Sequence, residues 1–192
     1  MTLQQLSEDQ AIRAWHFLAS DGHLANTTPP VVVVAGETYS VTGALALCEH
    51  GLHGCVRGVD ALAYAPGPIV CRTMHWGEVR SDGFKLCSTY RRVLWLADAS
   101  TTLHEFACET AERLLLAERA AGREPDPRSW AAVAAKRAWL RGELDDTALD
   151  AARSAARSAA WDAGGDAAWD RVNQDLEKRL YLLAPASVGG QR

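Results

Sequence analysis

The stretch that decides the fold lies at residues 69–97 and reads IVCRTMHWGEVRSDGFKLCSTYRRVLWLA. Its two halves, Ile69–Val79 and Leu86–Ala97, are rich in the β-branched and aromatic residues that favour strands. Between them, Arg80-Ser81-Asp82-Gly83 has the composition of a tight turn. The sequence therefore predicts two strands joined as a hairpin.

Shorter elements are predicted before this hairpin. The apolar run Ala14–Ala19 ends at the turn residues 20–22, and Val31–Val34 is β-branched throughout, so we expect both to be strands. Val59–Ala65 is expected to form a short helix, which Pro66-Gly67-Pro68 ends. Residues 1–100 are thus predicted to form a small, mainly β domain.

Helices are predicted beyond residue 100. A capping box of Thr102 and Glu105 begins the first helix, which stops at Gly122. Asp126, followed by a proline, begins a second helix that ends near Gly142. A third, long helix is expected from residue 145 or 146 to about residue 183, with a frayed tail over 185–192.

The predicted fold class is α+β. A small, mainly β N-terminal domain is followed over residues 101–184 by a three-helix region, rich in alanine and tryptophan, that packs on it. A length of 192 residues suits one substantial core, or a small domain with a helical extension.

Composition and charge narrow the function classes. The net charge is −4, and it divides evenly: residues 1–100 carry 7 Lys+Arg against 9 Asp+Glu, and residues 101–192 carry 13 against 15. Bulk electrostatics therefore gives no support for nucleic-acid binding, and Arg91-Arg92 after Tyr90 is interpreted as a solvated strand edge. The N-terminus lacks signal-peptide features, and no apolar run is long enough for a membrane span. With five cysteines, an odd number, we expect reduced thiols in a bacterial cytoplasm.

The main candidate site is a cluster of thiols and imidazoles. Cys48, His50, His53 and Cys55 fall within eight residues. Zinc needs four converging ligands, and these spacings are tighter than the usual pairs, so zinc is a minor alternative. Cys55 acting as a nucleophile with His53 or His50 is another, and packing of small buried thiols is favoured over both.

Further residues are assigned to the same corner. His16 lies in an apolar strand, where a hydrogen-bonded core histidine is the commoner outcome. Asp60 and Tyr64 follow the cluster on the predicted short helix. We treat all of them as a ligand-binding or structural corner; no catalytic motif is recognised, so no catalytic or metal-binding residue is assigned.

The helical region has candidate partner-binding residues of its own. Trp161 and Trp169 are eight residues apart and share one helix face, for which internal packing is favoured over partner binding. Arg137 and Arg141, with nearby basic residues, are expected to form ion pairs with glutamates of the preceding helix rather than to recognise an anion.

The first half of the chain resembles an uncharacterised domain family of bacteriophages, prophages and bacteria. The resemblance covers residues 14–98. The residues that carry it are Cys48, Gly51, Leu52, His53, Cys55, Asp60, Ala61, Leu62 and Tyr64, with residues 65–68, 77–79 and 91–95. Gly54 stands where alanine is usual, and Asp82 and Lys85 are separated where that family has an adjacent pair.

The second half resembles the helical domain of immunity proteins from polymorphic-toxin loci. The matches lie at residues 104–108, 111–113, 126–128 and 137–143, and in the alanine/tryptophan repeat. Together the two resemblances imply a phage or mobile-element setting, in which small proteins act by binding a host or rival factor.

The function expected from all of this is non-enzymatic binding. The partner is a host or rival protein or a small nucleotide-like ligand, with neither nucleic acid nor membrane involved and no cofactor, zinc remaining the alternative. A second hypothesis comes from the outline of residues 51–79, which is similar to ADP-ribosyltransferase-like folds and implies an NAD pocket containing His16, with Glu78 and Tyr39 as candidate catalytic residues. A third is an assembly module that oligomerises through the long helix.

Overall fold

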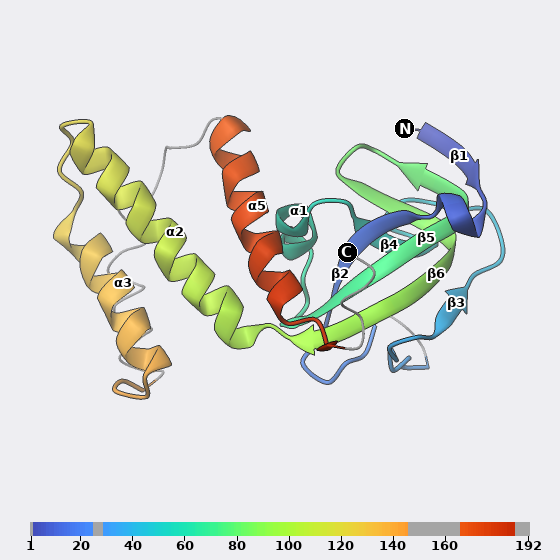
Figure 1. Cartoon of the computed structure of the whole chain (residues 1–192), viewed down its shortest axis with the longest axis horizontal. Coiled ribbons are helices and arrows are strands. Elements are labelled where there is room, and N and C mark those ends of the chain that lie inside the picture. The colour runs from blue at the N-terminus through green and yellow to red at the C-terminus, as the bar shows by residue number, and fades with distance from the viewer. Residues whose placement is uncertain (1, 25–28, 146–165, 187–192) are drawn as a thin grey trace. The chain divides into compact units, whose positions relative to one another are not determined.

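The structure is a computed structural model that describes residues 2–24, 29–145 and 166–186 (Figure 1). The chain forms two compact units: a sheet unit of residues 1–99 and 173–192, and a helical unit of residues 100–172. The predicted α+β fold is confirmed. Residues 101–184 were predicted to form one helical domain, whereas the end of the last helix belongs to the sheet unit, where Leu176 and Leu180 are fully buried.

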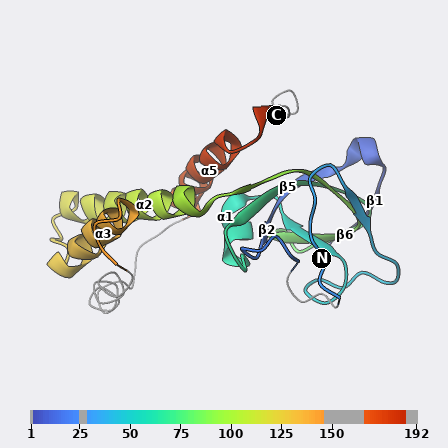
Figure 2. The same ribbon diagram turned by 90° about the horizontal axis from the view of Figure 1, so that it is seen from below.

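The described part of the sheet has six antiparallel strands. They are β1 (Thr2–Leu6), β2 (Ile12–Leu18), β3 (Thr38–Ser40), β4 (Leu52–Cys55), β5 (Ile69–Ser81) and β6 (Lys85–Asp98). Their order is β1-β5-β2-β4-β6-β3, and β5 also pairs with β6. Strands β5, β2, β4 and β6 therefore close on one another, with β5 and β6 as the long curved pair visible in Figure 2.

The predicted hairpin is the backbone of this sheet. Strands β5 and β6 pair from Ile69 with Asp98 to Ser81 with Leu86, with register shifts at two places. The connection is tight because the Asp82 carboxylate accepts hydrogen bonds from the backbone N–H groups of Phe84 and Lys85 (3.0 and 2.9 Å). These local bonds are the Asx-type turn chemistry that the sequence indicated.

A polar network lies inside the closed strands. His75 is fully buried, with its Nε2 atom 2.9 Å from the Thr73 hydroxyl and its Nδ1 atom 2.8 Å from the Ser88 hydroxyl. Burial lowers the pKa of His75 well below its ordinary value, so the ring is neutral at pH 7. A Cβ atom at Gly54 would stand 2.8 Å from this ring, so only glycine lets β4 approach β5 so closely.

The strand predicted at Val31–Val34 does not form in the described structure. Val31–Val34 forms only an isolated bridge, between Val32 and His23. The chain turns away at Gly36, whose φ of +87° and hydrogen bond to the Val93 carbonyl direct it toward β6. The β-branched residues serve packing instead, because Val33 is buried in a core cluster.

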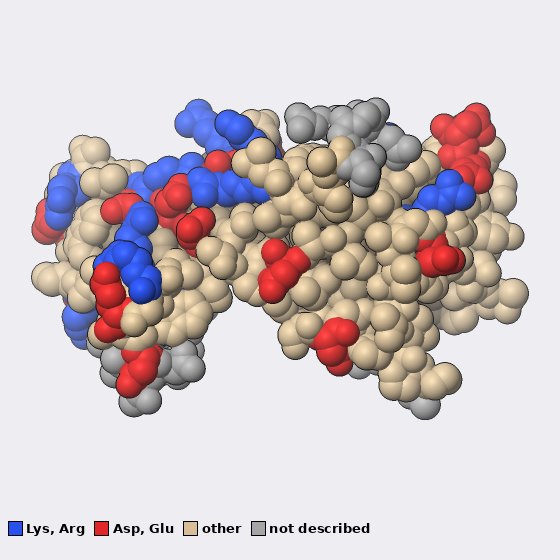
Figure 3. All heavy atoms as spheres, turned by 60° about the horizontal axis from the view of Figure 1, so that its bottom comes forward, with Lys and Arg blue, Asp and Glu red and all other residues tan. Residues whose placement is uncertain are grey.

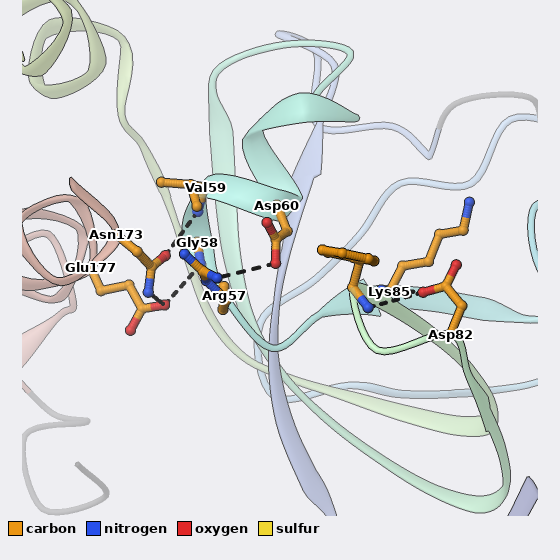
Figure 4. A network of polar contacts seen from close by, with 9 residues as sticks. Arg57, Gly58, Val59, Asp60, Asp82, Lys85, Asn173 and Glu177 are labelled. Atoms are coloured by element: carbon orange, nitrogen blue, oxygen red, sulfur yellow. Dashed lines mark hydrogen bonds and ion pairs between the residues drawn. The ribbon is translucent and has the colours of Figure 1, made fainter. Parts of the chain in front are cut away.

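The short helix α1 (Gly58–Ala63) is held by the C-terminal part of α5 (Asp166–Leu182). The Glu177 carboxylate accepts the Gly58 N–H (2.8 Å), and the Asn173 side-chain oxygen accepts the Val59 N–H (3.1 Å), as Figure 4 shows. These are the first backbone donors of α1, which a helix cannot satisfy by itself. The α1 prediction was nearly right, since residues 59–65 were expected.

The helical unit contains α2 (Ser100–Ala120) and α3 (Pro127–Leu140). The predicted capping box was wrong, because α2 already begins two residues before Thr102. The predicted ends are confirmed: Gly122 adopts φ +80° after α2, and the Asp126 side chain caps α3 by accepting the Arg128 N–H. On the face drawn in Figure 3, acidic and basic side chains alternate over this unit, whereas most of the sheet unit is uncharged.

Part of the predicted third helix lies outside the described residues. Helix α5 ends at Leu182, one residue from the expected end. Trp161 is not among the described residues, and although Trp169 lies in α5, the structure does not describe its side chain.

Candidate functional site

A cavity of about 340 Å³ lies where strands β2 and β4 separate. These two strands pair at only one position in the register, Trp15 with Cys55. Residues of β2, β4, β6 and the region around α1 therefore surround a space that no ladder of hydrogen bonds closes. Its walls are formed by Trp15, His16, Phe17, Leu24, Cys48, Gly51, Leu52, His53, Gly54, Cys55, Ala61, Tyr64, Pro66, Lys85 and Arg91.

The cavity brings together most of the corner that the sequence analysis singled out. Cys48, His53, Cys55, Tyr64 and His16 all line it. Two residues of that corner lie elsewhere. The His50 Nε2 atom is 2.8 Å from the Thr42 carbonyl oxygen, and the Asp60 carboxylate lies 3.9 Å from Arg57 in the first turn of α1.

Arg91 is the most unusual residue of the cavity wall. Only 1% of it is exposed, so its interpretation as part of a solvated strand edge was wrong. Its Nη1 atom donates to the His53 carbonyl (3.2 Å), while Nε and Nη2 are buried without a hydrogen-bond partner among the described residues. Burial lowers the pKa of Arg91 to about 10, and the group is therefore still charged at neutral pH.

The charge of Arg91 has no acidic counterpart in the cavity wall. Of the described residues that line the cavity, none is an aspartate or glutamate, while Lys85 adds a second cation. An uncompensated buried charge is costly, and one partner that would offset this cost is an anion entering the cavity.

Two imidazoles flank Arg91. The His53 Nε2 atom accepts the Cys48 backbone N–H (3.0 Å), which leaves the ring proton on Nδ1. Burial and the charges of Arg91 and Lys85 lower the pKa of His53, and burial and Arg91 lower that of His16 well below its ordinary value. Both rings are neutral at pH 7. The acceptor nitrogen of His53 already binds the Cys48 N–H, whereas His16 offers one donor and one acceptor.

His16 is the more available of the two. It is half-buried at the cavity wall, and its ring makes no hydrogen bond to the described part of the chain. The hydrogen-bonded core histidine that the sequence analysis expected at this position is found at His75 instead.

The mouth of the cavity has an exposed edge. Tyr64 is 60% exposed, and the Lys85 ammonium lies 4.9 Å from the centroid of its ring. The same ammonium contacts the thiol of Cys48, and this contact is the main reason that the pKa of Lys85 is raised. Cys48 adopts φ +70°, a left-handed conformation that is uncommon for a residue other than glycine.

The chemical alternatives for the cluster receive little support. Burial raises the pKa of the Cys55 thiol to about 12, so that almost no nucleophilic thiolate is present at pH 7. Within the described ranges, no three His, Cys, Asp or Glu side chains come close enough to hold a metal ion. The corner is thus better suited to binding than to thiol or zinc chemistry.

Of the two candidate partner-binding arginines, Arg137 forms the expected ion pair with the preceding helix, and Arg141 pairs elsewhere. Arg137 pairs with Glu112 of the preceding helix at 2.6 Å, whereas Arg141 pairs with Glu143 at 2.7 Å beyond its own helix. Both pairs are well exposed to solvent, where such pairs contribute little to stability.

Sequence reasoning missed Arg91, Lys85 and Trp15 as parts of the site. A signal for Arg91 was present: it has the same parity along β6 as Val93 and Trp95, and all three are buried. No local signal indicates the cavity, because it depends on the separation of β2 from β4.

Comparison of the chain with protein-family models, curated proteins and solved structures finds no match. None of the helices in the described ranges combines the length and apolar character needed to cross a membrane. Both family resemblances remain predictions, and the cavity is the feature of the structure that bears on function.

Proposed function

We propose that this protein is a binding protein that holds a small anionic ligand in the cavity between β2 and β4. The observation that carries the proposal is Arg91, a residue of the cavity wall whose buried guanidinium has two nitrogen atoms unpartnered in the described structure. Of the two modes of action expected from the sequence, this one is ligand sequestration rather than protein–protein contact.

An unpaired buried charge such as that of Arg91 destabilises a fold. The effective penalty is several kcal/mol, on the order of 3–5 kcal/mol when one partner of a buried pair is missing. When an anion binds next to the buried charge, part of this free-energy cost is removed, and this gain adds to the affinity for the ligand. Lys85 at the mouth adds attraction for the same sign of charge.

The size and lining of the cavity define the rest of the ligand. A volume of about 340 Å³ is near the lower end of the range of roughly 300–1,000 Å³ in which small-molecule sites fall. Trp15, Phe17 and Leu52 supply apolar walls, and Tyr64 lies at the rim. The ligand is therefore a compact molecule with an apolar or aromatic body.

The positions of the candidate catalytic residues support a binding protein rather than an enzyme. Of the two candidate residues for ADP-ribosyl transfer, Glu78 pairs with Arg80 (3.2 Å) and the Tyr39 hydroxyl accepts the Val34 N–H (2.8 Å). Neither residue is part of the cavity wall. The phage or mobile-element setting and the immunity or anti-defence role belong to the proposal and are supported by the sequence resemblances alone. The cytoplasmic location also belongs to it and is supported by the cysteine content and the N-terminal sequence.

Native mass spectrometry of the full chain, purified without chelator, tests the proposal. We expect a mass excess of a few hundred daltons that disappears on denaturation and that the Arg91→Met variant does not retain. If the wild type has the bare polypeptide mass and no compound from a library of small anions raises its melting temperature, the proposal is wrong.

A further inference from the structure

The two unpartnered nitrogen atoms of Arg91 lie on one edge of its guanidinium group. In arginine, the Nε–H and Nη2–H bonds point the same way and form a two-pronged donor that matches the two oxygens of a carboxylate. The third nitrogen, Nη1, is occupied by the His53 carbonyl. The unoccupied part of Arg91 is therefore the edge whose geometry suits an anion, through two parallel hydrogen bonds. Both nitrogen atoms are fully covered in this structure, so binding requires the Arg91 side chain to turn this edge toward the cavity that it lines.

Other arginines in the same chain show what this edge binds. The Nε and Nη2 atoms of Arg141 donate to the two carboxylate oxygens of Glu143, both at 2.7 Å. In Arg123 they donate to those of Glu118 at 2.6 and 2.8 Å. The same arrangement recurs for Arg119 with Glu124 and for Arg128 with Asp126. These four pairs are exposed, whereas Arg91 is buried and has no such partner in the described structure.

We propose that the cavity binds the carboxylate group of a small aromatic or apolar acid, held by the Nε and Nη2 atoms of Arg91; this proposal rests on the function proposed above. One guanidinium edge supplies two donors and one positive charge, which match the two oxygens and single charge of a carboxylate. The flanking rings of His16 and His53 are neutral, and Lys85 contacts Cys48 at the mouth. A phosphate dianion would bring a second charge and a third oxygen that these groups match less well.

His16 has a second role in this arrangement. Its ring lines the cavity and makes no hydrogen bond within the described chain, and it lies close enough to Arg91 for that charge to lower its pKa. It can therefore hydrogen-bond one further polar group of the acid, such as a hydroxyl or a ring nitrogen. This makes His16 the residue that distinguishes substituted acids from unsubstituted ones.

The test is titration calorimetry of the full chain at pH 7.5 with matched small probes. The carboxylate probes are benzoate, salicylate and indole-3-acetate; indole-3-acetamide is the neutral counterpart, and phenyl phosphate and AMP are the phosphate probes. We expect at least one carboxylate to bind, the amide to bind at least about 30-fold more weakly, and phenyl phosphate to bind more weakly than benzoate.

Variants locate the binding to Arg91. Arg91→Lys keeps the charge and removes the two-pronged edge, so we expect a loss of about 10-fold or more in carboxylate affinity, and a larger loss in Arg91→Met. Arg123→Lys is the matched control, since Arg123 binds Glu118 through the same two-pronged edge but does not line the cavity, and it should leave affinity unchanged. If an Arg91 variant does not fold, the carboxylate–amide comparison on the wild type decides alone.

The outcomes separate this inference from the function on which it rests. If phenyl phosphate or AMP binds and the carboxylates do not, or if indole-3-acetamide binds as well as the acid, the carboxylate assignment is wrong but a ligand-binding function stands. If carboxylates bind equally well to wild type and Arg91→Met, the site is wrongly placed. If no probe binds and native mass spectrometry finds the bare chain, both proposals fail.

Discussion

Two arginines of the β5–β6 hairpin, Arg72 and Arg91, are both buried, at 9% and 1% exposure, yet their surroundings differ. Each has two guanidinium nitrogen atoms without a hydrogen-bond partner in the described structure. Arg72 lies over the rings of Trp15 and Tyr181, with its Cζ atom 4.5 and 5.5 Å from the ring centroids. Arg91 borders the cavity, and its Cζ atom is 5.9 Å from the centroid of the Tyr39 ring.

The difference separates a structural arginine from a ligand-binding one. Cation–π contacts with two rings, worth about 0.5–2 kcal/mol each, offset part of the cost of burying Arg72. The unpartnered atoms of Arg72 are Nε and Nη1, which do not form the parallel edge that binds a carboxylate, whereas those of Arg91 do. Counting unpartnered atoms alone would treat the two residues as equal.

The largest expected effect is on the aromatic cluster around Arg72. Trp95 is 3% exposed and meets Trp15 edge to face, with ring centroids 5.8 Å apart, but it does not line the cavity. Trp95→Ala should lower the free energy of unfolding by about 3–5 kcal/mol, because the buried ring and its contact with Trp15 are lost. Urea denaturation measures this; a loss below about 1 kcal/mol would mean that the aromatic cluster does not stabilise the sheet unit.

The next comparison uses the two arginines directly. Arg72→Met should lower the free energy of unfolding by about 1–2 kcal/mol, because the stacking on Trp15 and Tyr181 is lost. Arg91→Met should leave that free energy unchanged or raise it by about 1–3 kcal/mol in the absence of ligand, because an unpaired buried charge is removed. Equal destabilisation by both substitutions would contradict a ligand-binding role for Arg91.

A smaller effect is expected where α5 holds α1, which borders the cavity. Glu177→Ala removes the acceptor for the Gly58 N–H and should lower the free energy of unfolding by about 1–2 kcal/mol. Asp175→Ala is the comparison on the same helix, since the pair of Asp175 with Arg179 (3.4 Å) is partly exposed to solvent and should contribute about 1 kcal/mol or less. The reverse order would mean that the α1 contact is not important for stability.

The smallest expected effect is a change in pH dependence. The folded pKa of His16 lies well below 6.5, so the unfolded chain binds a proton as the pH falls through 6.5 while the folded chain does not. The stability is therefore fully present above pH 6.5 and decreases below it, by up to about 1.4 kcal/mol per pH unit for each such histidine. His16→Gln should reduce this slope between pH 6.5 and 5.5; an unchanged slope would show that His16 protonates freely in the fold.

How far the sequence predicts the molecule depends on how local the determinants are. The hairpin, the ends of α2 and the cap of α3 follow from turn and capping residues such as Asp82, Gly122 and Asp126, which act on their own neighbours. Strands β1, β3 and β4 were not predicted, because β1 is polar and exposed, β3 has three residues, and β4 contains Gly54. Their pairing is decided by partners far along the chain.

The residues of the candidate site likewise fall into those that local sequence indicates and those that depend on distant partners. The Cys/His cluster attracted attention because it is dense in sequence, and Cys48, His53 and Cys55 do line the cavity. Arg91 was misinterpreted because adjacent arginines usually face solvent. In the structure it is buried, and its hydrogen-bond acceptor is the His53 carbonyl of β4, a strand far away in the sequence. The strand parity of Arg91 with Val93 and Trp95 was the one local sign.

The most direct test of the central claim is NMR observation of the arginine side-chain ¹H–¹⁵Nε correlations during titration with benzoate or indole-3-acetate. Arg91 and Arg72 are both buried, so their Nε–H signals are protected from exchange and can be compared in one spectrum. The account predicts a saturable downfield shift of the Arg91 signal, as the Nε–H bonds to a carboxylate, with Arg72 unchanged. An Arg91 signal that stays in place while a carboxylate binds, or a shift of Arg72 instead, would contradict it.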